Sequence, residues 1–102
     1  MKALKLRHLI ALLLYISGGV VPKQSLLNQV RNLGLLLDRD FEVRCVPTGL
    51  YSPDFELATS ELVGLGFIDK TFSKAGKEFH YTLTPSGTKL VEQLKGRMRE
   101  ND

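Results

Sequence analysis

Three polar side chains fall on one face of a helix predicted over residues 22–37. Gln24, Asn28 and Arg31 are spaced by four and three residues, and the other face of this segment is apolar. Glutamine, asparagine and arginine can each form paired hydrogen bonds with the edges of adenine or guanine. The same pattern is also typical of a helix face in contact with water. Base recognition by these three residues is therefore one of two interpretations of this face.

No combination of residues in the sequence matches a catalytic or metal-binding site. Gly64-x-Gly66 lacks the third glycine of a dinucleotide-binding loop, and it precedes a predicted strand where that motif requires a helix. His8 and His80 have no CxxC or HExxH partner, so no metal is expected. The single cysteine, Cys45, excludes an internal disulfide and favours a reducing compartment. We expect a cytoplasmic protein that is not an enzyme and carries no cofactor.

Length and composition indicate one domain over residues 1–102, with a polar end at 98–102. The chain is 43% hydrophobic and 25% charged, which is ordinary for a globular domain. Its net charge of +3 is unevenly distributed: residues 1–48 carry seven basic and three acidic groups, 49–64 carry three acidic and no basic groups, and 65–102 carry seven basic and five acidic groups. A mildly basic protein is compatible with nucleic acid without requiring it.

The first predicted helix ends at Gly18 and Gly19 and is apolar nearly all round. Its expected core stripe is Leu6, Leu9, Ile10, Leu13 and Ile16. A helix of this kind should be covered on both sides, which favours a homodimer formed through this helix. The alternative is that the last helix of the same chain covers it. The apolar run is too short to span a membrane, so no membrane partner is expected.

Two further helices have the same start signal. Ser52 is a good N-cap residue and Pro53 suits the first helical position, where its missing N–H has no intrahelical partner. This helix is predicted to end near Gly64. Thr84 and Pro85 repeat the signal and begin a final amphipathic helix.

Residues 67–84 predict a β-hairpin. The segments 67–72 and 78–84 are rich in aromatic and β-branched residues, and in the second segment Phe79, Tyr81 and Leu83 fall on one face. Between them, Gly76 can adopt a positive φ and so close a tight turn. The turn is basic.

Residues 38–51 predict a short strand followed by a turn. Apolar side chains at Phe41, Val43 and Cys45 alternate with charged ones, as in a strand with one buried face. A proline and a glycine at positions 47 and 49 then indicate a turn. Cys45 is expected to be a small buried side chain.

About half of the chain resembles a known family. The residues that carry the resemblance are Leu62-Val63-Gly64-Leu65-Gly66-Phe67-Ile68, then Tyr81-Thr82-Leu83-Thr84-Pro85-Ser86-Gly87, and Leu90. This pattern resembles winged helix-turn-helix proteins, especially small archaeal and bacterial transcriptional regulators. The resemblance implies an α+β, mostly α fold with a three-helix core, a two-stranded β-hairpin wing and a C-terminal helix.

The resemblance also implies a partner, double-stranded DNA. In that family the helix before the wing enters the major groove, and the wing tip touches the backbone or the minor groove. By position, the helix at about 52–64 would read DNA and the hairpin at about 67–84 would be the wing. Contacts would come from the wing lysines and from polar residues of the reading helix: Lys70, Lys74, Lys77, Tyr51, Ser52 and Ser60.

A winged-helix module that binds protein instead of DNA is the second hypothesis. With Phe55 facing inward, Glu56, Leu57 and Glu61 face outward, and no lysine or arginine lies between residues 49 and 64. Carboxylates facing phosphates repel them, whereas an exposed leucine between two acids could meet a basic protein partner.

Overall fold

The computed structural model describes residues 5–36, 43–47 and 49–100. The described residues form four helices and five strands, so the fold is α+β and mostly helical. In chain order these are α1 (Leu6–Ser17), β1 (Val21–Pro22), α2 (Lys23–Leu36), β2 (Arg44–Val46), β3 (Gly49–Tyr51), α3 (Pro53–Gly64), β4 (Ile68–Ser73), β5 (Glu78–Leu83) and α4 (Pro85–Glu100). The predicted strand residue Phe41 and the predicted helix end at residue 37 lie outside the described residues.

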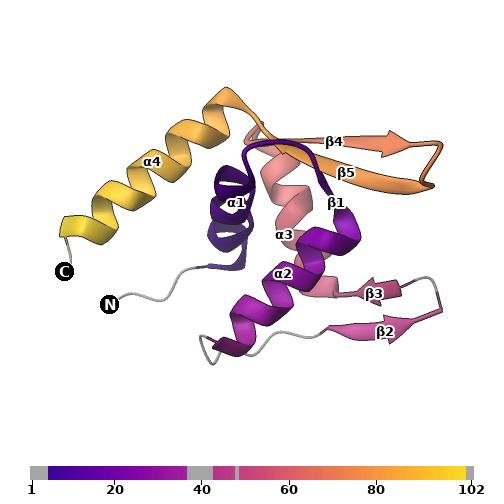
Figure 1. Cartoon of the computed structure of the whole chain (residues 1–102). Helices are drawn as coiled ribbons and strands as arrows, with labels where there is room; N and C mark the ends of the chain where they lie inside the picture. The colour runs from indigo at the N-terminus through magenta and orange to yellow at the C-terminus, as the bar shows by residue number, and fades with distance from the viewer. Residues whose placement is uncertain (1–4, 37–42, 48, 101–102) are drawn as a thin grey trace.

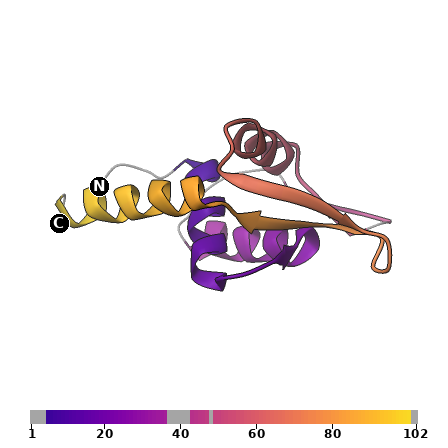
Figure 2. The same ribbon diagram turned by 90° about the horizontal axis from the view of Figure 1, so that it is seen from above.

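Helices α1, α2 and α3 pack together on one face of an antiparallel sheet with strand order β1-β5-β4. Strands β2 and β3 form a separate two-stranded sheet. The β4–β5 and β2–β3 hairpins project to the same side of the molecule, whereas α4 projects to the opposite side (Figures 1 and 2). The helices therefore form a body with two arms at one end.

Helix α1 is the centre of the core. It packs against α2, α3, α4 and β5, and its side chains at Leu9, Ile10, Ala11 and Leu14 are buried. The predicted stripe is wrong at Ile16, which is 71% exposed, because the covering elements leave the last turn of α1 open. The last helix thus covers part of α1, as the alternative to dimerisation expected. The homodimer stays a prediction.

The predicted helix boundaries at residues 52 and 84 are confirmed. The hydroxyl of Ser52 accepts a hydrogen bond from the backbone N–H of Phe55 at 3.3 Å, and that of Thr84 accepts one from Gly87 at 3.1 Å. The Thr84 hydroxyl also donates to the carbonyl of Gly66 at 2.7 Å. One side chain therefore caps α4 and fastens its start to the turn that follows α3.

The hairpin is confirmed, but it is part of a larger sheet than expected. Val21 pairs with Tyr81, so β1 adds a third strand beside β5, and α2 begins at Lys23 instead of Pro22. The predicted positive φ at Gly76 is also wrong, because the turn places it at Lys77, with φ 52°. Tyr81 is fully buried, and this burial raises the pKa of its phenol.

The strand predicted around Cys45 exists as β2, but its environment differs from the prediction. Residues 49–51, expected as part of a turn, form the partner strand β3. Because this hairpin pairs only with itself and projects from the body, Cys45 is exposed instead of buried. Alternation indicated a strand and could not indicate whether the rest of the chain covers it.

In the part of the chain that the structure describes, no helix combines the length and apolar character needed to cross a membrane.

Candidate nucleic-acid interface

The β4–β5 hairpin carries three exposed lysines. Lys74 and Lys77 lie in the turn at its tip, and Lys70 lies on β4. The ammonium nitrogen of Lys70 lies 4.3 Å from the centre of the Phe79 ring, a cation–π contact. The three lysines predicted as wing contacts are thus on one projecting arm.

Two exposed aromatic rings lie beside these lysines. Phe72 and Phe79 are direct cross-strand partners, and their rings meet in a T-shaped arrangement with centres 5.1 Å apart. Their exposed fractions are 53% and 37%. Sequence reasoning placed Phe79 on the same face as Tyr81, which is correct, but alternation does not indicate how far the core extends along a strand. The hairpin register could have indicated the pairing with Phe72.

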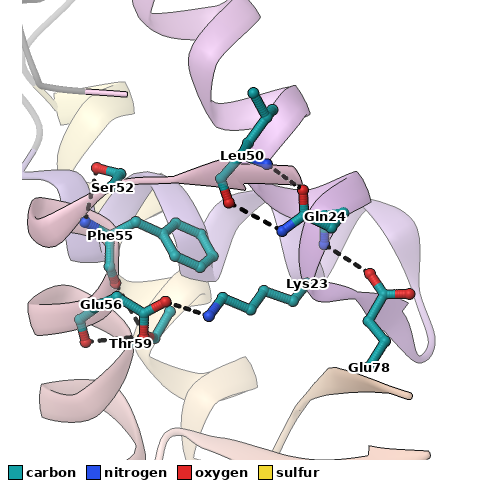
Figure 3. Close-up of polar contacts among 8 residues, drawn as sticks. All are labelled: Lys23, Gln24, Leu50, Ser52, Phe55, Glu56, Thr59 and Glu78. Atoms are coloured by element: carbon teal, nitrogen blue, oxygen red, sulfur yellow. Dashed lines mark hydrogen bonds and ion pairs between the residues drawn. The ribbon is translucent and has the colours of Figure 1, made fainter. Parts of the chain in front are cut away.

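Two of the three acidic residues of α3 form ion pairs with cations from other helices. Glu61 binds the Arg7 guanidinium of α1 at 2.8 Å, and Glu56 forms an ion pair with Lys23 of α2 (Figure 3). Leu57 and Ser60 are exposed side chains on the outward face of α3. The predicted contact residue Ser60 is accessible, and two of the three acids in the segment 49–64 have a local counter-charge.

Ser52 is not available to a ligand. It is fully buried, and its hydroxyl caps α3 (Figure 3). The prediction of a contact from this residue is wrong because the capping role that marks the helix start also places the side chain inside the protein.

Tyr51, the residue before Ser52, is 40% exposed and lies opposite Arg44 in the β2–β3 hairpin. Arg44 is an exposed cation that sequence reasoning did not select.

The side chain of Gln24, predicted as a possible base-reading residue, is used within the protein. Its side-chain amide accepts a hydrogen bond from the backbone N–H of Leu50 at 2.7 Å and donates one to the carbonyl of Leu50 at 3.0 Å (Figure 3). It therefore binds β3 as a neighbouring strand would. Gly49, with φ 131°, leaves room for this amide, because a side chain there would collide with it.

We expect Gln24→Ala to lower the free energy of unfolding by about 2 kcal/mol, because it leaves both polar groups of the Leu50 backbone without this partner. Urea unfolding followed by circular dichroism measures the change. Gln29→Ala is the matched control, since the amide of Gln29 binds only the exposed hydroxyl of Ser25 among the hydrogen bonds described, and its effect should stay within about 0.5 kcal/mol. Equal losses in the two variants would contradict the proposed bracing of β3.

Asn28 and Arg31 lie on the outer side of α2. The guanidinium of Arg31 donates to the side-chain carbonyl of Asn28 at 3.1 Å, and Arg31 is half-buried. Asn28 and Arg31 therefore lie together near the surface, whereas the Gln24 amide is bound to the backbone of Leu50. This weakens the base-reading interpretation of α2.

Glu78 connects the β4–β5 hairpin to the start of α2. Its carboxylate accepts a hydrogen bond from the backbone N–H of Gln24 at 3.0 Å (Figure 3). A negative charge at this end of a helix is favourable, since the first N–H groups lack intrahelical partners. This carboxylate, which lies next to the turn of the lysine-bearing hairpin, therefore has a structural use.

The described residues hold no group of three or more histidine, cysteine, aspartate or glutamate side chains arranged to bind a metal ion. Comparisons with protein-family models, with curated proteins and with solved structures find no match to this chain.

Proposed function

We propose that this chain is a winged-helix protein that binds double-stranded DNA and acts as a small transcriptional regulator. Three helices are followed by a hairpin and a final helix, the order that the sequence resemblance implies. In this proposal α3 approaches the major groove and the β4–β5 hairpin is the wing. The observation that carries the proposal is the set of exposed lysines, Lys70, Lys74 and Lys77, on one projecting hairpin.

Charge pairing within the protein supports this use of α3. The ion pairs of Glu56 with Lys23 and of Glu61 with Arg7 reduce the repulsion that these acids would exert on phosphates. Leu57 and Ser60 are then the exposed side chains nearest the middle of the helix. A methyl-bearing and a hydroxyl side chain can contact thymine methyl groups and base edges.

The β2–β3 hairpin gives further support, because it projects to the same side as the wing (Figures 1 and 2). It carries the exposed pair of Arg44 and Tyr51 on opposite strands. In the proposal Arg44 adds a phosphate contact from a second arm.

The proposal is tested by fluorescence anisotropy with duplex DNA over a salt series. The three lysine–phosphate contacts and the one from Arg44 should give a slope of about −3.5 in a plot of log affinity against log salt concentration, because each contact releases condensed counterions. Absence of binding at low salt would contradict the proposal.

A protein-binding module is the second candidate, favoured by one observation. Leu57 and Leu65 are 64% and 62% exposed, and Val63 between them is 38% exposed. Exposed apolar side chains on and after α3 suit a protein partner. If duplex DNA does not bind, this candidate takes the leading place.

A further inference from the structure

We propose that the wing stacks on unpaired bases, so that the protein prefers duplex DNA with a single-stranded segment over continuous duplex. The inference rests on the proposed function and assigns a ligand to the exposed rings of Phe72 and Phe79. The proposed function assigns phosphate contacts to the lysines and no ligand to these rings.

The two phenylalanines form a supported stacking surface. They are paired across β4 and β5, their ring planes are inclined by 72°, and Phe72 is the more exposed, at 53%. Lys70 lies over the Phe79 ring. Phe79 thus braces its neighbour from the side, and Phe72 offers the open ring.

The position of the pair along the hairpin leaves it accessible. Tyr81, two residues after Phe79 on the same face, is fully buried against the helices. The core therefore ends between these two residues, and the rings lie on the part of the hairpin that extends toward the tip. A ligand can reach them without any rearrangement of the core.

Charge around the rings suits a nucleic-acid strand. Lys70 alternates with Asp69 and Thr71 along β4, so it shares the face of Phe72 while the aspartate faces the other way. The nearby carboxylate of Glu78 is bound to the start of α2. The cations Lys70 and Lys74 can therefore hold phosphates on either side of a base stacked on Phe72.

Unpaired bases fit this surface better than paired ones. A base inside continuous duplex is already stacked on both faces, so an inserted ring must first separate two base pairs. An unpaired base has a free face, and stacking on an aromatic side chain is tolerant of sequence. The same lysines serve both kinds of DNA, so the aromatic pair decides the preference.

The test compares continuous duplex with the same duplex carrying a short unpaired overhang, both measured by anisotropy. We expect the overhang to raise affinity about tenfold, and Phe72→Leu to remove that gain while leaving duplex affinity unchanged. Phe72→Tyr should retain it, since tyrosine also stacks. Leu65→Ala is the control, because it alters an exposed apolar residue outside the hairpin strands.

A second readout uses the absence of tryptophan from the sequence. Phe72→Trp places one fluorophore on the wing, and we expect its emission to be quenched by the overhang DNA and not by continuous duplex. Circular dichroism melting of each variant shows whether the fold is retained, and quenching of the Phe72→Trp variant carries the test if the leucine variant does not fold.

The outcomes separate this inference from the proposed function. Salt-dependent duplex binding without a preference for the overhang, or a preference that survives in the leucine variant, would overturn the stacking inference alone. No binding to either DNA would overturn the proposed function with it. Phe72→Trp emission that is unchanged by overhang DNA that does bind would also overturn the stacking inference.

Discussion

Gly87→Ala is expected to lower the free energy of unfolding by about 3 kcal/mol, although alanine usually favours a helix over glycine. Gly87 lies in the first turn of α4 and is buried. A Cβ atom there would collide with the backbone carbonyl of Phe67 and with the Leu83 side chain. The carbonyl cannot move freely, because it accepts a hydrogen bond from Thr84 N–H at 3.1 Å. The new methyl group must therefore push α4 away from the sheet.

The matched control is Gly96→Ala, which lies on the same helix. A Cβ at Gly96 meets no atom within 4 Å, so this variant should gain up to about 1 kcal/mol from helix propensity. Urea unfolding followed by circular dichroism gives both values. Stabilisation by both substitutions would show that α4 does not approach the sheet this closely.

The second large effect is expected for DNA binding. Lys74→Glu with Lys77→Glu should weaken duplex affinity by well over tenfold and make the salt slope shallower by about 2, because two phosphate contacts become repulsions. Both side chains lie in the exposed turn of the wing, where no described packing depends on them. Anisotropy in a salt series measures both quantities.

Lys89→Glu with Lys95→Glu is the control for net charge. It changes the charge by the same amount on α4, which projects away from both hairpins (Figures 1 and 2). We expect a loss in affinity of less than about threefold from this pair, since screening weakens charges more than a Debye length from the DNA. Similar losses in the two double variants would indicate non-specific attraction instead of contact by the wing.

Local chemistry predicted the starts of α3 and α4 and the end of α1. Ser52 and Thr84 cap their helices as expected, and Gly18, with φ 70°, ends α1. Each of these signals depends on hydrogen bonds within a few residues, so the sequence alone contains the required information. The alternation of residues 78–83 likewise predicted the faces of β5.

Partners distant in the sequence could not be predicted in this way. The amide of Gln24 binds Leu50, which is 26 residues away, and Arg7 binds Glu61, which is 54 residues away. Helical spacing placed Gln24 on a polar face, and nothing local distinguishes a polar side chain that meets water from one that meets a backbone. The ion pairs of α3 were missed for the same reason. The pairing of Val21 with Tyr81 also depends on the assembled fold.

The wing contains both residues whose role was predicted from the sequence and residues whose exposure was not. Lys70, Lys74 and Lys77 were selected from the resemblance and are exposed. The exposure of Phe72 and Phe79 depends on where the helices stop covering the sheet, which is a property of packing. Aromatic residues in a strand usually belong to the core. The exposure of Phe72 and Phe79 was therefore not predicted.

Both arms of the molecule are attached to one residue of α2. The backbone N–H of Gln24 donates to the carboxylate of Glu78 near the turn of the wing, and its side chain binds Leu50 in the other hairpin (Figure 3). The first turn of α2 therefore links the two hairpins to each other. Fraying of that single turn would remove both attachments together, so the spacing between the hairpins depends on the start of α2.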